Sequence, residues 1–231
     1  MPTLILSMPI YQLPEDEMWF PDVSEFEGDI IGVGGGLEAE RLLLAYSNGI
    51  FPWYNEPGNI IWWCPVKRCV LYLDELRVSH SMRNVINRQM YKVTMDRAFD
   101  DVIEGCRSGV RQNATWLIDE MAEAFHTLHD MGLAHSVEVW CEGELVGGLY
   151  GLSIGRMFYG ESMFAKKSNS SKVGFITLVD HLRQKGFKMI DCQVYNEHLG
   201  SLGARDIPRE DFLTYLKEAL NNKTYKGKWV L

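Results

Sequence analysis

The stretch Glu144–Phe164 reads ELVGGLYGLSIGRMFYGESMF, and it follows HSVEVW, His135–Trp140, after three residues that favour a turn. HSVEVW alternates polar and apolar side chains, which is the period of a half-buried strand. ELVGGLYG continues as a second strand, Gly155 interrupts the chain, and RMFYGESMF is a third extended run. The stretch therefore predicts an antiparallel meander at the centre of a sheet.

This meander is unusually rich in glycine, at Gly147, Gly148, Gly151, Gly155 and Gly160. Glycine inside a strand loses packing and entropy, so it marks a bulge or a place where a group approaches the backbone. One interpretation is an ordinary sheet softened by glycine. The other is a splayed sheet with a slot for an acyl group or a peptide. Glu161 favours the slot, because a carboxylate flanked by Phe158 and Phe164 is costly to bury without a partner.

Length and composition define a broad class. The 231 residues suffice for one large domain or two modest ones, and 46% hydrophobic with 23% charged residues is typical of a soluble globular protein. No apolar run reaches the roughly 18–20 residues that span a bilayer. The start, MPTLILSMPIYQLP, lacks the basic region of a signal peptide.

The cysteines and histidines argue against a metal site. Five cysteines are scattered without a CxxC motif, which disfavours a disulfide framework and a zinc site and favours a reducing cytosol. His126 and His129 lie three residues apart, but no third ligand is in view, so we interpret them as surface or capping residues. We expect neither a metal nor another cofactor.

The net charge of −8 disfavours a general nucleic-acid binder and suits a ligand that carries positive charge. Any nucleic-acid contact should be local, through Lys166, Lys167 and Lys172 or through Arg83 and Arg88.

The remaining chain predicts alternating helices and strands, hence an α+β fold. Helices are expected at 38–48, 79–89, 98–106, 118–131, 171–186 and 208–221, and strands before the glycines of 30–37 and at 67–73, 91–96 and 187–193. Residues 1–30 read as an irregular arm. We place the boundary between an N-terminal domain, 1–80, and a C-terminal domain, 81–231.

Aromatic residues crowd Gly49–Trp63, at Phe51, Trp53, Tyr54, Trp62 and Trp63. They form either a small core or a platform for flat rings, since base stacking is worth roughly 1–3 kcal/mol per base. Core packing is favoured because indoles are mostly buried. The adjacent Trp62 and Trp63 should face opposite sides of an extended chain.

Two further segments carry polar signals. The run AKKSNSSK, 165–172, opens a helix directly after a strand, which suits either helix capping or an anion site at the helix N-terminus. Asp191 and Gln193 end a strand, and a period of two places both on one face, where they are able to orient a nucleophilic amine. A polar strand end that faces water is the alternative. No Ser-His-Asp or Cys-His set is apparent.

Taken together, the sequence resembles the leucyl/phenylalanyl-tRNA–protein transferases along nearly its whole length. The matching runs are RLLLAYSNGIFPWY, IIWWCP, TWL, AHSVEVW, LVGGLYG, FYGESMF, Ser171–Lys172, DCQV and SLGARDIPR. The resemblance implies a small N-terminal α/β unit and a C-terminal domain with the fold of the GCN5-related N-acetyltransferases, built on a mostly antiparallel sheet. It implies a cytoplasmic, monomeric aminoacyltransferase. The enzyme would move Leu or Phe, with Met as a further donor, from aminoacyl-tRNA to the α-amino group of proteins beginning with Arg or Lys, which marks them for N-degron degradation.

The resemblance also implies roles for individual residues. Asp191 and Gln193 would be the catalytic pair, with Glu161 beside them. Trp53, Trp116 and Tyr46 would hold the 3′-terminal adenosine of the tRNA. Leu149 and Phe158 would line the pocket for the transferred side chain. Because the ester of aminoacyl-tRNA is already activated, such an enzyme mainly needs proximity and orientation.

This sequence departs from the family pattern at Phe125, where members have Tyr, and at Leu149, where some have Met. An acyl-CoA-dependent N-acetyltransferase is one rival, but its (Q/R)xxGx(G/A) loop is replaced by the glycine-free FAKKSNSSK. A non-catalytic module that binds tRNA or N-degrons is the other.

Overall fold

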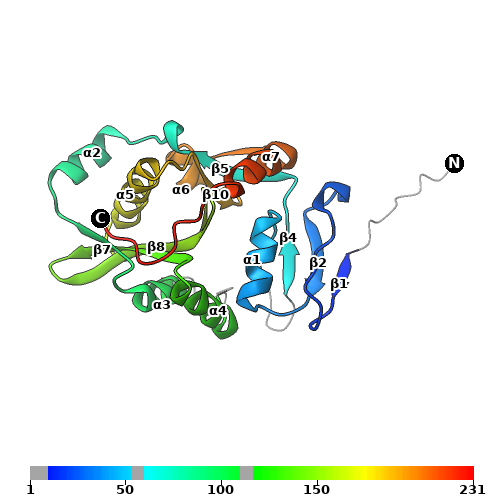
Figure 1. Ribbon diagram of the computed structural model, residues 1–231. Helices are drawn as coiled ribbons and strands as arrows, with labels where there is room; N and C mark the ends of the chain where they lie inside the picture. The colour runs from blue at the N-terminus through cyan, green and yellow to red at the C-terminus, as the bar shows by residue number, and fades with distance from the viewer. Residues whose placement is uncertain (1–9, 54–59, 110–116) are drawn as a thin grey trace.

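The computed structural model describes residues 10–53, 60–109 and 117–231. Its strands form a small N-terminal sheet and a larger sheet beside it (Figure 1). In spatial order the small sheet contains β1 (Tyr11–Leu13), β2 (Ile30–Gly34), β4 (Ile61–Trp63) and β3 (Phe51–Pro52). The seven-stranded sheet contains β11 (Arg205–Pro208), β5 (Lys67–Tyr72), β10 (Met189–Gln193), β9 (Met157–Ala165), β8 (Glu144–Ile154), β7 (Ala134–Cys141) and β6 (Lys92–Met95). The predicted α+β class is confirmed.

The predicted meander forms the centre of the larger sheet. β7, β8 and β9 pair antiparallel in sequence order. Glu142 and Gly143 both have positive φ, 54° and 85°, as a tight two-residue hairpin turn requires. β9 and β10 run parallel, whereas the other neighbours in this sheet are antiparallel, so the sheet is mostly antiparallel as expected.

The two sheets divide the chain between Trp63, where β4 ends, and Lys67, where β5 begins. The expected boundary at residue 80 therefore assigned β5 to the N-terminal unit, whereas β5 lies inside the larger sheet between β10 and β11. A strand buried between two neighbours needs apolar residues, which KRCVLY supplies.

Helices cover both faces of the larger sheet, with α5 on one side and α3 and α4 on the other (Figure 1). The helices are α1 (Ala39–Ser47), α2 (His80–Asn87), α3 (Phe99–Gly109), α4 (Asp119–Asp130), α5 (Ser170–Gln184), α6 (Glu197–Ser201) and α7 (Arg209–Leu220). The side chains of β8 point alternately to the two faces of the sheet. Tyr150 and Leu152 pack in the core with α3 and α4, and Leu149 packs in the core with α5. No helix in the described ranges has the length and apolar character needed to cross a bilayer.

The helices at 38–48, 79–89, 98–106, 118–131, 171–186 and 208–221 are confirmed to within a few residues. Ser79 caps α2 as predicted, accepting a hydrogen bond from the Met82 backbone N–H at 3.2 Å. α6 and β11 lie in the segment between β10 and α7, for which no element was predicted.

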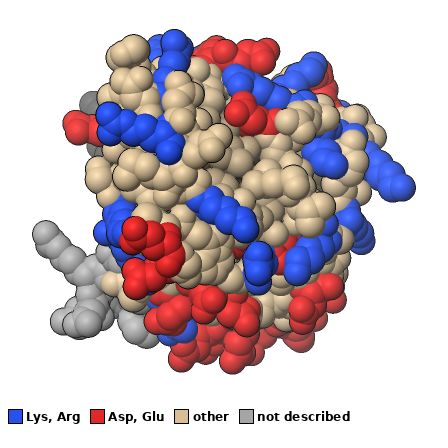
Figure 2. All heavy atoms as spheres, turned by 90° about the vertical axis from the view of Figure 1, so that its left-hand side faces the viewer, with Lys and Arg blue, Asp and Glu red and all other residues tan. Residues whose placement is uncertain are grey.

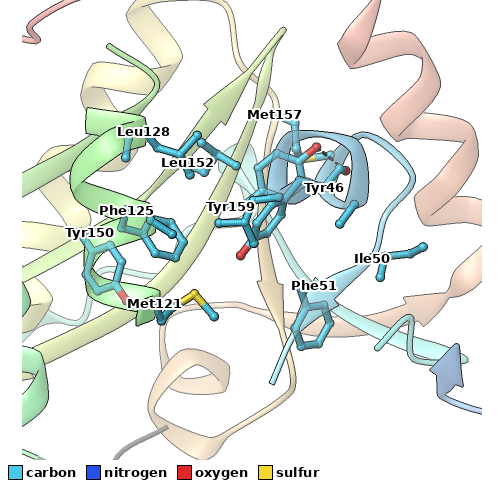
Figure 3. Packing of buried hydrophobic residues seen from close by; sticks show 14 of the residues in the cluster. Tyr46, Ile50, Phe51, Met121, Phe125, Leu128, Tyr150, Leu152, Met157 and Tyr159 are labelled. Carbon is cyan, nitrogen blue, oxygen red and sulfur yellow. Dashed lines mark hydrogen bonds between the residues drawn. The ribbon is translucent and has the colours of Figure 1, made fainter. Parts of the chain in front are cut away.

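α1 joins the small sheet to the larger one. The Tyr46 ring lies against the Tyr159 ring of β9 with 5.0 Å between centroids, and the Tyr159 hydroxyl donates to the Tyr46 carbonyl at 3.0 Å. Figure 3 shows this pair in the core between α1, α4 and the sheet. The N-terminal unit is therefore part of one continuous core with the larger sheet.

Arg209, the first residue of α7, fastens the N-terminal segment to the rest of the chain. Its guanidinium is buried and donates to five carbonyl oxygens, those of Val23, Phe26, Gly28, Cys64 and Pro65. Buried carbonyl groups need such donors, because leaving one unpaired costs about 1–3 kcal/mol.

We expect Arg209→Met to lower the free energy of unfolding by about 3 kcal/mol or more, because several buried carbonyls lose their donor at once. Urea denaturation followed by circular dichroism measures this loss. Arg205→Met is the matched control, since Arg205 makes an exposed ion pair with Glu75 and should matter little. If both variants lowered the free energy of unfolding equally, the hydrogen bonds of Arg209 would not contribute more to stability than a surface ion pair.

Candidate active site

A cavity of about 810 Å³ opens where β9 and β10 separate. The two strands pair from Met189↔Met157 to Asp191↔Tyr159, after which β9 continues along β8 while β10 ends in a bulge at Gln193. The cavity wall includes Glu161 and Ser162 of β9 and the end of β10. This volume lies in the range of cavities that hold small organic ligands. The slot was predicted within the glycine-rich meander, whereas the opening lies between β9 and β10, because β8 and β9 stay paired along their length.

The inner part of the cavity is apolar and lies between the sheet and α5. Its wall is made by Leu149, Phe158, Phe175, Leu178, Ile190 and Leu199. Leu149 and Phe158, which were predicted to line a side-chain pocket, lie together here. Such a surface favours an aliphatic or aromatic group over a charged one.

The glycine-rich strand contributes to this site differently from the slot interpretation. A Cβ at Gly147 would collide with Ser170, one at Gly148 would lie 3.0 Å from Phe164 and one at Gly151 would lie 2.7 Å from Phe158. The space beside these three glycines is thus filled by the protein itself. Gly160 is the glycine of the meander that lines the cavity within the described residues.

Glu161 is the acidic residue of the cavity wall. One of its carboxylate oxygens accepts hydrogen bonds from the Tyr46 hydroxyl at 2.8 Å and from the Gln193 side-chain amide at 2.9 Å. Burial raises the pKa of Glu161 to about 8, although both hydrogen bonds favour the ionised form and oppose the rise. A group with this pKa exchanges a proton near neutral pH, which is the property of a general base.

The period-two prediction for Asp191 and Gln193 is wrong because the strand has a bulge between them. Gln193 has a positive φ of 61°, and its side chain turns into the cavity. Asp191 is fully buried beside the cavity and does not line it. The Gln193 backbone N–H donates to the Asp191 carboxylate at 2.9 Å, so the carboxylate supports the bulge.

Arg68 of β5 is a site residue that sequence reasoning missed. Its guanidinium makes two hydrogen bonds, of 2.7 and 2.6 Å, to the two carboxylate oxygens of Asp191, and both side chains are buried. It also lies between the rings of Phe51 and Phe212, at 4.6 and 4.5 Å from their centroids. Burial lowers the pKa of Arg68, but the charge of Asp191 and its hydrogen bonds outweigh this effect and leave the pKa raised. The available signal was an arginine inside an apolar strand, which needs an anion when buried.

The aromatic segment divides between core and cavity. Trp62 is fully buried and its indole N–H donates to the Gly34 carbonyl, whereas Trp63 is half-buried against Trp53 with 5.8 Å between ring centroids. The predicted opposite orientation of Trp62 and Trp63 agrees with this difference in burial. Trp53 lines the cavity. Tyr46 is buried behind Glu161, outside the cavity wall, and Trp116 lies outside the described residues.

Phe125 occupies the position at which Tyr was expected. It is fully buried in α4 and meets Tyr150 edge to face, with 5.1 Å between ring centroids (Figure 3). Tyr150 lines the cavity, and burial followed by the charge of Glu161 raises its pKa.

The histidines have local partners. His126 lies 3.0 Å from Asp100, and His129 lies 2.8 Å from the Ala134 carbonyl oxygen. Across the three described ranges, no three His, Cys, Asp or Glu side chains come together as metal ligands would. All five cysteines are free.

Comparison with known proteins gives consistent matches. The family model described as leucyl/phenylalanyl-tRNA protein transferase matches residues 70–217, and the model of its N-terminal domain matches residues 35–66. The chain is 51% identical over 205 residues to the leucyl/phenylalanyl-tRNA–protein transferase of Flavobacterium psychrophilum, covering 87% of this chain and 97% of the relative. It is 49% identical over 224 residues to that of Syntrophobacter fumaroxidans, covering 96% of each.

Solved structures resemble it more distantly. An aminoglycoside acetyltransferase from an uncultured soil metagenomic sample overlays with a TM-score of 0.39 at 15% identity, covering 62% of this chain and 97% of the other. A GCN5-related N-acetyltransferase from Kribbella flavida overlays with a TM-score of 0.33 at 10% identity, covering 76% and 61%.

Proposed function

Because the chain belongs to the leucyl/phenylalanyl-tRNA–protein transferase family, we propose that its cavity transfers Leu or Phe, with Met as a further donor, to proteins that begin with Arg or Lys. The chain is an aminoacyltransferase that uses aminoacyl-tRNA and a protein as substrates. The observation that carries the proposal is the position of Glu161: a carboxyl group with a pKa of about 8 on the wall of an apolar cavity.

The donor half of the proposal uses the inner cavity and its aromatic edge. Leu149 and Phe158 take the side chain of the transferred residue, since burying it removes apolar surface from water. Trp53 provides a ring on which the terminal adenine of the tRNA stacks. Trp116 is assigned the same task from the sequence resemblance.

The acceptor half uses Glu161 as the base. The carboxylate takes one proton from the α-ammonium group of the acceptor, and the freed nitrogen attacks the ester carbonyl. The new C–N bond forms as the C–O bond to the ribose breaks. The ribose oxygen takes the second amine proton, and the proton on Glu161 passes to solvent. Bringing amine and ester together supplies much of the acceleration, because the ester is already activated.

The other polar residues orient Glu161 and the amine. Gln193 serves as both donor and acceptor of hydrogen bonds. Its amide N–H₂ donates to Glu161, and its amide oxygen is available to accept a hydrogen bond from the amine. Tyr46 acts through Glu161, by the hydrogen bond that its hydroxyl donates. Asp191 acts through the Gln193 backbone.

The test compares two labelled donors on one acceptor. Purified protein is incubated with radiolabelled Leu-tRNA and a peptide beginning with Arg, and in parallel with labelled acetyl-CoA. We expect label only from Leu-tRNA, and none when the Arg α-amine is acetylated or when the peptide begins with Glu. Equal labelling of the Glu peptide would overturn the Arg/Lys preference, and transfer only from acetyl-CoA would overturn the proposal.

The wider setting belongs to the same proposal. The product, a protein with a new N-terminal Leu or Phe, enters N-degron degradation. The five free cysteines suit a cytoplasmic protein, because thiols persist in a reducing compartment. A monomer is expected, and light scattering coupled to size exclusion measures it directly.

A further inference from the structure

The start of α5 lacks the side-chain capping that its sequence suggests. Asn169 occupies the N-cap position without donating or accepting a side-chain capping bond. The Ser170 hydroxyl instead donates to the carbonyl oxygens of Val146 and Lys167. Of the two sequence interpretations of this segment, helix capping by these side chains is therefore wrong.

The first turn of α5 consequently keeps unpaired donors. The backbone N–H groups of Ser171 and Lys172 have no hydrogen-bond partner in the described part of the chain, as expected for a helix start without a cap. The Ser171 side chain is 94% buried, since its exposed fraction is 6%, and it lines the cavity. Its hydroxyl likewise has no partner among the described residues. Ser171 therefore presents an unpaired hydroxyl to the cavity, where a ligand or a water molecule can pair with it.

Two basic residues flank Ser171, Lys172 on its own helix and His198 of α6. The Lys172 ammonium lies beside α6, 3.1 Å from the Ser201 hydroxyl. His198 of α6 lines the cavity, and burial and the nearby Lys172 lower the pKa of His198, so that its neutral ring still offers one N–H donor. Lys166 and Lys167 are exposed in the turn before the helix. Ser171 and His198 thus line the same cavity that Trp53 borders, whereas the Lys167 ammonium lies 3.4 Å from the Cys141 sulfur at the end of β7.

The position of this start is fixed by the sheet. Ser170 lies directly over Gly147 of β8, where any side chain would collide with it. The Tyr91 hydroxyl donates to the Ser168 carbonyl at 2.8 Å and holds the preceding turn. The N–H groups of the first turn are thus held in place before a ligand arrives, which lowers the entropic cost of binding.

We propose that the first turn of α5, with Ser171, Lys172 and His198, binds a backbone phosphate of the 3′-terminal strand of the aminoacyl-tRNA. A helix N-terminus with free N–H groups and a nearby lysine is suited to phosphate through both hydrogen bonding and the helix dipole. The inference rests on the proposed function, in which the cavity holds the aminoacyl end of the tRNA. It assigns to the cavity mouth a contact that the terminal adenosine and the transferred residue do not provide.

Charge decides between the two substrates at this mouth. The acceptor carries an α-ammonium group and a cationic Arg or Lys side chain, whereas the donor strand is a polyanion, and unpaired N–H groups at a helix N-terminus favour the anion. Charge is also unevenly spread over the molecule: Figure 2 shows a dense group of Asp and Glu side chains along the lower edge of one face, with Lys and Arg side chains above it. α3 and α4 contribute exposed acidic residues, among them Asp100, Asp101, Asp119, Glu120 and Glu123. The net charge of −8 therefore leaves room for a local phosphate contact.

Ser171→Asp tests the proposal by placing a carboxylate where the phosphate would bind, and circular dichroism verifies that the variant folds. A carboxylate in the first turn of a helix is favoured by the helix dipole, and it occupies the site that a phosphate would need. Ser81→Asp is the matched control, because Ser81 is the second residue of α2 as Ser171 is the second residue of α5, and it is exposed. Lys172→Gln is a second variant that removes charge without adding any.

The readout compares three donors: Leu-tRNA, the leucyl ester of the trinucleotide CCA, and 3′-O-leucyladenosine, which has no phosphate. We expect Ser171→Asp to raise KM about tenfold or more for the first two donors and to leave leucyladenosine within about twofold, with Ser81→Asp unchanged on all three. The slope of log KM against log salt concentration for the CCA ester should fall by about 0.7, the value for one phosphate contact on a single strand. Lys172→Gln should shift the same donors in the same direction by a smaller factor.

Two results would overturn the proposal. An equal rise in KM for leucyladenosine would place Ser171 in the wall of the side-chain pocket, and an unchanged KM for all three donors would exclude a phosphate contact at this helix. A further case is a wild-type protein that uses Leu-tRNA and the CCA ester and not leucyladenosine. In that case the slope of log KM against log salt concentration, measured for Leu-tRNA and for the CCA ester in wild type and Ser171→Asp, still tests the site. If no donor is used by the wild type, the proposed function itself fails, and this outcome is separate from a failure of the phosphate site.

Discussion

Glu161→Gln should lower kcat about 10²- to 10³-fold at pH 8 while changing KM for the donor little. A positioned general base typically contributes 10²- to 10⁴-fold, and glutamine keeps the size of the side chain and the hydrogen bond from Tyr46. Steady-state transfer of labelled Leu to an Arg peptide, at saturating donor and acceptor, measures this change. The residual activity reports what proximity in the cavity supplies without a base.

Glu161→Gln should also remove the part of the pH dependence of kcat that comes from the ionisation of Glu161. In the wild type, kcat should rise with pH and level off above about 8, because the ionised form of Glu161 is the base and its pKa is about 8. The α-amino group of the acceptor titrates near the same pH, roughly 7.7–8.0 in model peptides, so the profile alone does not assign the midpoint.

Tyr46→Phe resolves this ambiguity and serves as the control. The hydrogen bond from Tyr46 lowers the pKa of Glu161, so its removal should move the midpoint of kcat to higher pH while leaving the acceptor amine as it is. If the midpoint stays in place in Tyr46→Phe and in Glu161→Gln, it belongs to the amine, and Glu161 is not the base.

Periodicity predicted the elements of this fold well wherever the signal is local. The meander, the helix faces and the Ser79 cap depend on residues close in sequence, and all three are present. Short segments without a strong period escaped prediction, as α6 and β11 show. β5 shows a related limit: its apolar pattern specifies a buried strand and leaves open which of the two sheets receives it.

The candidate site was predictable in its residue types but not in its connections. Glu161 was singled out because a carboxylate among aromatic residues needs a partner, and its partners Tyr46 and Gln193 are 115 and 32 residues away in sequence. The pairing of Arg68 with Asp191 spans 123 residues. The side chains of Asp191 and Gln193 point in different directions because of the bulge, in which Gln193 has a positive φ. No local preference predicts a positive φ at a glutamine.

Arg68 and Asp191 carry the second large prediction. Because both groups are buried, Arg68→Met or Asp191→Asn alone leaves one uncompensated charge in the core and should lower the free energy of unfolding by about 3–5 kcal/mol. The double variant Arg68→Met/Asp191→Asn removes both charges, and it should recover most of that loss, since neutral replacements of buried ion pairs are often tolerated. Urea denaturation of the two single variants and the double variant gives these values as a cycle.

A second double variant separates stability from catalysis. Asparagine at position 191 keeps an oxygen that accepts from the Gln193 backbone N–H, whereas leucine in Arg68→Met/Asp191→Leu removes it. If Asp191 acts by holding the bulge, the Asn double variant should retain kcat within about tenfold of the wild type, and the Leu double variant should lose about 10²-fold at similar stability. If instead Asp191 removes the amine proton itself, both double variants lose the carboxylate and should be equally inactive. Equal inactivity would return Asp191 to the role of a catalytic base and reduce Glu161 to a residue that orients the amine.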